Sequence, residues 1–138
     1  MNFLLDANVI IDKALVRARH GDVDELFALL TGDQICISRF SLHAVAWYIT
    51  PRNPDVFRRL CMDLSFAGVR VVDLALDELP RALDAMASYR LDFDDAFNLA
   101  IAEKYDVSIV SFDTDFDRVP RGRQTPAQVV AQLKSVDP

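Results

Sequence analysis

The sequence predicts an α/β domain in which a mostly parallel sheet of four or five short strands is flanked by helices. Four short apolar runs alternate with longer stretches in which apolar residues recur every three or four positions. Strands separated by helices in this way are typical of βαβ units, which build parallel sheets. The length of 138 residues and the 51% share of hydrophobic residues suit one core, so we expect a single domain over residues 1–138.

The first half of the chain is predicted to contain two strands, each followed by helices. Asp6 directly follows the first strand, where it can cap a helix. Gly21 and Asp22 are expected to break the helical pattern, and Gly32 is expected to end the second helix. Pro51 ends the third helix. The expected elements are a strand at 2–5, helices at 7–15 and 23–30, a strand at 34–38, and helices at 39–49 and 54–64.

The second half continues the alternation. Pro80 falls in the first turn of a predicted helix, the only turn that tolerates it. Asp92 opens the next helix, and Thr125 with Pro126 marks the start of the last one, as cap and first residue. The expected elements are a strand at 69–72, a helix at 76–87, a helix from residue 92, a strand at 108–111, an irregular loop, and a helix at 126–133.

Two groups of aspartates dominate residues 92–117. The first group opens a helix and the second follows a strand, while Asp6 follows the first strand far upstream. Carboxylates just past strand ends lie where α/β folds place ligands. Two of them ~4 Å apart would repel by about 4 kcal/mol at an effective dielectric near 20. A divalent cation removes this repulsion, so the pattern indicates a hard-metal site. The groups are Asp92, Asp94, Asp95 and Asp113, Asp115, Asp117.

Helix capping is the alternative explanation for these acids. Carboxylates in a first turn bind free N–H groups and favour the helix dipole. One aspartate suffices for this purpose, however, and Asp95 falls on the same face as Leu99, which we expect to be buried. Other chemistries lack their residues: no Gly-rich phosphate loop is present, and neither histidine lies near a Ser or Cys that would indicate a triad.

The charge balance is acidic, with a formal net charge of −6 and a pI near 4.7, which argues weakly against a nucleic-acid partner. Twelve of the 15 basic residues are nevertheless arginines, which suit bidentate phosphate contacts. Arg118, Arg121 and Arg123 follow the second acid group and are candidate RNA contacts, or else ordinary solvated surface. No apolar run approaches the ~20 residues of a membrane span. We therefore expect no membrane partner and a cytoplasmic location.

Three motifs together resemble the PIN-domain ribonucleases, and in particular the small VapC-like toxins of bacterial toxin–antitoxin pairs. They are L-L-D-A-N-V-I-I-D at 4–12, D-D-A at 94–96 and S-F-D-T-D-F-D at 111–117. The resemblance implies a parallel sheet and a pocket of three or four acids that holds Mg²⁺ or Mn²⁺. It also implies an RNA substrate, a cognate antitoxin protein and a homodimer, for which Trp47, Tyr48 and Phe57 are candidate contacts.

The resemblance also implies roles for individual residues. Asp6, Asp95 and Asp113 match the core catalytic and metal-binding acids, and Asp117 matches an acid that is used only in some members. Asn8 and Ser111 match the supporting polar residues.

The chain departs from the pattern at one place, where the family carries a glutamate in the helix after its second strand. That position falls on Ala44, with His43 beside it. Either His43 supplies the missing contact, or the pocket works with fewer ligands and one metal ion, or catalysis is lost. The sequence therefore favours a metal-dependent endoribonuclease. The alternatives are a catalytically silent RNA- or protein-binding module and a DNA-directed nuclease.

Overall fold

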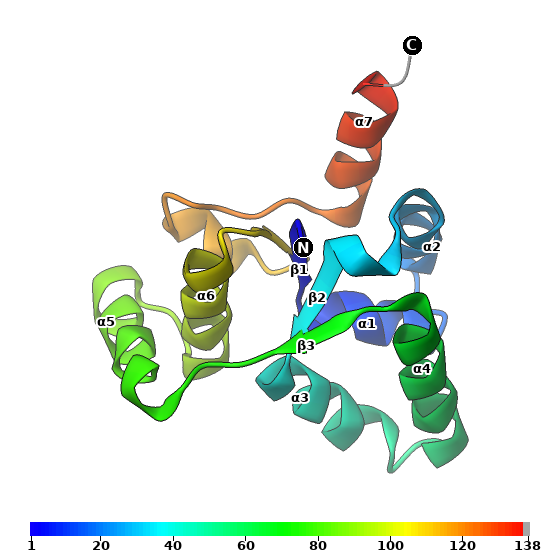
Figure 1. The fold of residues 1–138 in the computed structure, drawn as a ribbon, viewed down its shortest axis with the longest axis horizontal. Helices are drawn as coiled ribbons and strands as arrows, with labels where there is room; N and C mark the ends of the chain where they lie inside the picture. Colours follow the sequence, from blue (N-terminus) through cyan, green and yellow to red (C-terminus); the bar gives the residue numbers. More distant parts are fainter. Residues whose placement is uncertain (137–138) are drawn as a thin grey trace.

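Four short parallel strands form the centre of the fold (Figure 1). The structure is a computed structural model that describes residues 1–136, so the last two residues of the expected domain lie outside the described range. The strand order is β3-β2-β1-β4, and each neighbouring pair is parallel, with Phe3 of β1 opposite both Ile35 and Ser108. The strands are β1 (Phe3–Leu5), β2 (Ile35–Ser38), β3 (Arg70–Val72) and β4 (Ser108–Val110). The predicted α/β class with a parallel sheet is confirmed.

Helices cover both faces of this sheet. In Figure 1, α5 and α6 lie together on one side of the strands, and α1, α2 and α4 lie on the other. The α-helices within residues 1–136 are α1 (Ala7–Ala14), α2 (His20–Leu29), α3 (Arg39–Ile49), α4 (Pro54–Ala67), α5 (Pro80–Tyr89), α6 (Phe93–Tyr105) and α7 (Pro126–Val136). None of them is long and apolar enough to cross a bilayer.

The alternation of side chains along each strand divides the core into two clusters. Leu4 and Ile109 point to the cluster that α5 and α6 cover, whereas Leu5 and Val110 point to the cluster covered by α1, α2, α3, α4 and α7. Successive strand residues face opposite sides of a sheet, and both sides are apolar here because helices cover both. Most of the strand residues are therefore buried, as in other doubly covered parallel sheets.

Local signals fix several helix ends. Ser38 caps α3 by accepting a hydrogen bond from the Ser41 N–H at 3.0 Å. Pro54 is the first residue of α4, and Gly68 ends that helix with a φ of 86°, a left-handed conformation that glycine adopts without strain. The Ser38 cap starts the helix that leaves the carboxyl edge of the sheet directly after β2.

Four local predictions were wrong. Gly32 does not end the second helix, because α2 ends at Leu29 with Leu30 as its cap and Gly32 instead starts the 3₁₀ helix η1 (Gly32–Gln34). Gly21 and Asp22 do not break a helix but lie in the first turn of α2, where N–H groups need no intrahelical partner. The predicted helix at 76–87 is divided: η2 (Leu76–Glu78) is a short 3₁₀ turn, and Pro80 starts α5 because it lacks an N–H and suits a first helical position. The loop after β4 is also not wholly irregular, since it contains the 3₁₀ helix η3 (Thr114–Arg118).

Candidate active site

The candidate site lies at the carboxyl ends of the neighbouring strands β1 and β4. The chain proceeds from β1 to β2 on one side, whereas β4 lies on the other side, so the strand order reverses between β1 and β4. Ligands of parallel α/β sheets bind at such a reversal. Asp6 follows β1 while Ser111 and Asp113 follow β4, and the Ser111 hydroxyl lies 2.7 Å from the Asp6 carboxylate. The fold therefore brings these sequence-predicted residues together.

Four hydrogen bonds hold the Asp6 carboxylate in place. Ser111 Oγ donates at 2.7 Å and the Ala7 main-chain N–H donates at 2.8 Å. The amides of Asn98 and Asn8 donate at 3.2 and 3.4 Å. The same Asn8 amide lies 3.3 Å from Ser111 Oγ. Asn8 and Ser111, the predicted supporting polar residues, thus both contact the Asp6 carboxylate.

Asn98 is a member of this network that the sequence analysis did not identify. Its side-chain oxygen accepts a hydrogen bond from Ser38 Oγ at 2.8 Å, and its amide nitrogen donates to Ser41 Oγ at 3.0 Å. The signal was available, because Asn98 follows Asp95 by three residues and so lies on the same face of α6. Asn98 links α6 to the end of β2 and, through Asp6, to the end of β1.

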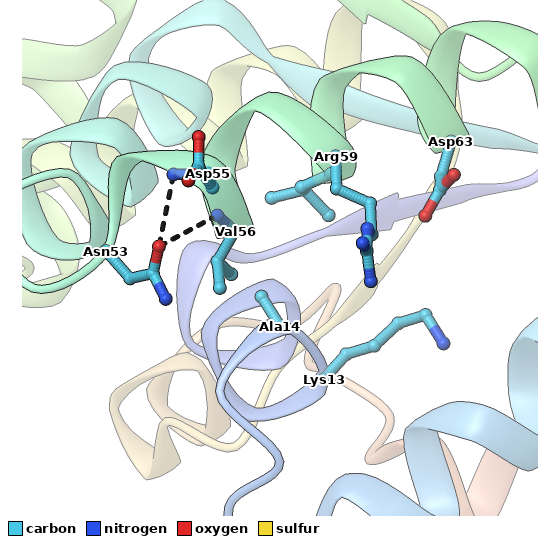
Figure 2. Close-up of a pocket in the computed structure, with 8 residues that line it drawn as sticks. Lys13, Ala14, Asn53, Asp55, Val56, Arg59 and Asp63 are labelled. Carbon is cyan, nitrogen blue, oxygen red and sulfur yellow. Dashed lines mark hydrogen bonds between the residues drawn. The ribbon is translucent and has the colours of Figure 1, made fainter.

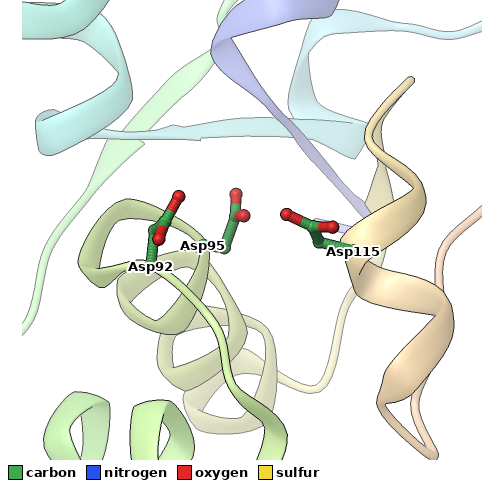
Figure 3. A group of neighbouring side chains, drawn as sticks. All are labelled: Asp92, Asp95 and Asp115. Atoms are coloured by element: carbon green, nitrogen blue, oxygen red, sulfur yellow. The ribbon is translucent and has the colours of Figure 1, made fainter.

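Three carboxylates converge beside this network. Asp92 and Asp95 come from the start of α6 and Asp115 comes from η3, and each offers an oxygen within 4.8 Å of the other two (Figure 3). Asp95 is buried, with 4% of its surface exposed. Asp92 occupies the cap position of α6, but its side chain makes no capping hydrogen bond. The capping explanation therefore does not account for Asp92.

Asp95 and Asp6 are the two carboxylates of the site whose ionised forms are destabilised, mainly by burial. Burial, together with the nearby charges of Asp94, Asp113 and Asp6, raises the pKa of Asp95 to about 8. Burial likewise raises the pKa of Asp6, although the hydrogen bond from Ser111 partly offsets this effect. Oxygen donors of this kind fit a hard divalent cation such as Mg²⁺ or Mn²⁺, which would stabilise the ionised forms.

Asp113 and Asp117 differ in their surroundings. Asp113 caps η3 by accepting a hydrogen bond from the Asp115 N–H at 2.9 Å, and its own N–H donates to Ser111 Oγ at 2.9 Å. Asp117 instead forms a two-point pair with Arg123, at 3.1 Å to Nε and 3.3 Å to Nη2. The carboxylate of Asp117 is therefore engaged by an arginine, while Asp113 belongs to the acid network.

The three arginines behind the acids are largely occupied by internal partners. Arg121 contacts Asp106 at 3.4 Å and donates to a main-chain carbonyl at 3.1 Å. Arg123 also donates to a main-chain carbonyl at 3.1 Å, in addition to its pair with Asp117. Arg118 contacts Asp115 at 3.1 Å, and its side chain remains half exposed. Arg118 is the most accessible of the three.

The helix α3 carries both residues at the place where the family pattern has a glutamate. Ser41 and Val45 are the buried positions of this stretch, and Ser41 contacts Asn98. At about 100° per residue, Ala44 lies about 60° from Ser41 around the helix, whereas His43 lies about 160° away. Both residues are exposed. His43 makes no hydrogen bond to the acids within residues 1–136, and Ala44 is on the side closer to them.

A pocket of about 420 Å³ lies elsewhere, between α1 and α4 (Figure 2). Its lining includes Lys13, Arg59 and Asp63, together with apolar side chains of both helices. It contains none of the residues of the acid network. The chemistry of the acids is therefore located at the open carboxyl edge of the sheet, outside this pocket.

Comparisons with known proteins agree with this fold. Residues 3–122 match the PIN domain family. A solved toxin–antitoxin complex from Klebsiella pneumoniae is 24% identical over 91% of this chain and 98% of its own, with a TM-score of 0.73. The toxin VapC20 of Mycobacterium tuberculosis, described as cleaving the sarcin–ricin loop, is 19% identical over 86% of this chain and 95% of its own, with a TM-score of 0.69.

A third similar structure is VapBC2 from Rickettsia felis, solved with a DNA fragment from its promoter. It is 14% identical over 89% of this chain and 96% of its own, with a TM-score of 0.70. No curated protein sequence matches the chain.

Proposed function

Because the chain belongs to the PIN domain family, we propose that it is a divalent-metal-dependent endoribonuclease that hydrolyses RNA phosphodiester bonds. The observation that carries this proposal is the acid network at the reversal of strand order. Asp95 is buried there among other carboxylates, and its pKa is raised to about 8. Buried carboxylates that repel one another destabilise a fold. Their presence therefore indicates that they bind a cation or take part in a reaction.

Asp6, Asp95 and Asp113 are the proposed catalytic acids and metal ligands, with Asp92 and Asp115 completing the open side of the site. Asp117 is not included, because both of its oxygens lie against Arg123. A divalent cation such as Mg²⁺ or Mn²⁺ would supply a Lewis acid for the attacked phosphate and make the attacking water more acidic.

The surrounding polar residues fix the geometry of these acids. Ser111 and Asn98 orient the Asp6 carboxylate, and Ser111 also accepts the N–H of Asp113. One hydroxyl therefore positions two acids from different strands. This arrangement keeps the carboxylates converging even though they repel one another.

We further propose that the protein acts in the cytoplasm as the toxin of a toxin–antitoxin pair. The similarity to solved complexes of toxins with antitoxins supports an antitoxin partner. A homodimer is proposed as the assembly, with Trp47 as its best candidate contact because 85% of this residue is exposed. Tyr48 and Phe57 are half-buried and would contribute less.

A catalytically silent RNA- or protein-binding module is the second candidate, and Ala44 is the observation that favours it. The alanine supplies no carboxylate on the side of α3 that is closer to the acids. The two functions differ in a cleavage assay on total RNA. An enzyme cleaves RNA with Mn²⁺ or Mg²⁺ and stops when EDTA is added, whereas a binding module retards RNA without cleaving it under any of these conditions.

A further inference from the structure

A third buried carboxylate lies outside the acid network. Within residues 1–136 the buried acidic side chains are Asp6, Asp95 and Asp12, and 6% of Asp12 is exposed. Asp12 is on α1, one helical turn or about 6 Å beyond Asn8. Its Oδ2 lies 3.4 Å from Nε of Arg19, a residue of the connection between α1 and α2. A buried carboxylate normally has a charged partner, and Arg19 is the partner of Asp12. The pair therefore raises the question of what Arg19 itself contributes.

Two contacts fix the guanidinium of Arg19. Asp12 holds its Nε, and its Cζ lies 3.6 Å from the centroid of the Phe112 ring, in a cation–π arrangement. The side chain is nevertheless 53% exposed. Neither of its terminal nitrogens donates a hydrogen bond to another residue in the part of the chain that the structure describes. The guanidinium is therefore held on one side by Asp12 and Phe112, while its two terminal nitrogens remain free to donate hydrogen bonds on the other side.

Through Phe112, Arg19 contacts the segment that carries Ser111 and Asp113 of the proposed active site. Phe112 stands between Ser111 and Asp113 in the sequence, and its N–H donates to Asn8 Oδ1 at 3.3 Å. The ring under the guanidinium thus belongs to the same segment that carries the acids. Arg121 and Arg123, which follow the acids in the sequence, differ from Arg19 because they donate hydrogen bonds to other groups of the protein.

We propose that Arg19 binds a backbone phosphate of the RNA next to the one attacked, and that Asp12 is the residue that positions it. This inference rests on the proposed function for its ligand, single-stranded RNA. An arginine whose guanidinium is already oriented can donate two hydrogen bonds from its free terminal nitrogens to one phosphate. It loses little side-chain entropy when it binds. It also supplies positive charge at the edge of a strongly acidic site in a chain of net charge −6.

The test measures the binding of a short, fluorescein-labelled single-stranded RNA of mixed sequence by anisotropy, in EDTA, over salt concentrations from about 50 to 200 mM. Arg19→Ala should weaken binding about tenfold at low salt and reduce the slope of log affinity against log salt by about one. Arg19→Lys should restore the slope but only part of the affinity, because lysine keeps the charge and loses the planar fork. Arg81→Ala, an exposed arginine on α5, is the matched control and should leave the slope unchanged.

Two further variants separate binding from folding. Asp12→Asn keeps the Arg19 charge but releases its orientation, so it should lower affinity with little change in slope. The double variant Asp12→Asn with Arg19→Ala leaves no unpaired buried charge, so it should fold and still show the reduced slope. If Arg19→Ala binds RNA with the affinity and slope of wild type, the pair with Asp12 only anchors the connection between α1 and α2, and the inference is overturned.

The outcome for Arg19 is separate from the outcome for the proposed function. A wild-type protein that cleaves RNA but does not depend on Arg19 for binding contradicts the inference alone. A wild-type protein that binds RNA through Arg19 without cleaving it contradicts the nuclease and supports the inference. A protein that neither binds nor cleaves RNA contradicts both.

Discussion

Replacing Asp95 by asparagine should stabilise the protein when no metal is present. Burial of the carboxylate, together with the charges of Asp94, Asp113 and Asp6 around it, raises its pKa to about 8 from an ordinary value near 3.9. Folding at pH 7 therefore requires Asp95 to take up a proton that the unfolded chain does not hold. Asparagine keeps nearly the same shape and removes this requirement.

The size of the stabilisation by Asp95→Asn follows from the shift in the pKa of Asp95. Each pKa unit corresponds to about 1.36 kcal/mol, so the three units between 3.9 and pH 7 set an upper bound of about 4 kcal/mol. Water on the open side of the site reduces this value. We expect Asp95→Asn to gain about 2 kcal/mol in EDTA at pH 7.

The stabilisation by Asp95→Asn should increase with pH. A carboxyl group whose pKa is raised in the folded state contributes full stability below its unfolded value, near pH 3.9, and loses it as the pH rises through about 8. The difference between Asp95→Asn and wild type should thus be close to zero near pH 4 and should increase up to about pH 8. Added Mn²⁺ should stabilise wild type, by about 2.7 kcal/mol at a hundred times its Kd, and should stabilise the variant much less.

Urea unfolding in EDTA at several pH values measures these differences. Asp84→Asn is the matched control, because Asp84 is an exposed aspartate on α5, away from the site. That variant should match wild type at every pH within about 0.5 kcal/mol. If Asp95→Asn is less stable than wild type in EDTA at pH 7, Asp95 serves to stabilise the start of α6 and the argument from repulsion is refuted.

Three more outcomes are expected. Asn98→Ala should cost about 1–3 kcal/mol by urea unfolding and should slow RNA cleavage, because Asp6 loses a buried donor; unchanged stability would contradict this. His43→Ala should leave RNA cleavage with Mn²⁺ unchanged and Ala44→Glu should raise it, since Ala44 is on the side of α3 closer to the acids; a strong loss in His43→Ala would reverse the assignment. Arg123→Ala should lower stability in urea by about 1–2 kcal/mol because this side chain holds the segment beside β4, and wild-type stability would indicate a surface role.

Much of the fold could be predicted because local and periodic signals agree. The alternation of apolar runs with helical periodicity predicted all four strands, and Pro126 marked the start of the last helix through the conformation that its ring imposes. The division at Pro80 was not predicted, because a proline in a first turn is compatible with either one helix or a new start.

The convergence of aspartates at one edge of the sheet could be predicted, but their contacts could not. The spacing of the aspartates after strand ends indicated a cation site, since a strand order with a reversal brings such ends together. Sequence alone did not reveal that Asn98 would join Asp6, or that Arg123 would bind Asp117, because both contacts depend on how segments distant in the sequence pack. The same limit applies to Arg19, whose partners come from α1 and from the segment after β4.

Titration calorimetry with Mn²⁺ tests most directly whether the acid network is a metal centre. Wild-type protein should bind Mn²⁺ with a saturable heat signal, Asp84→Asn should bind it equally well, and Asp95→Asn should lose most of the affinity because its buried oxygen ligand becomes neutral. The account would be contradicted by a wild-type protein that does not bind Mn²⁺, or by an Asp95→Asn variant that binds it as tightly as wild type does.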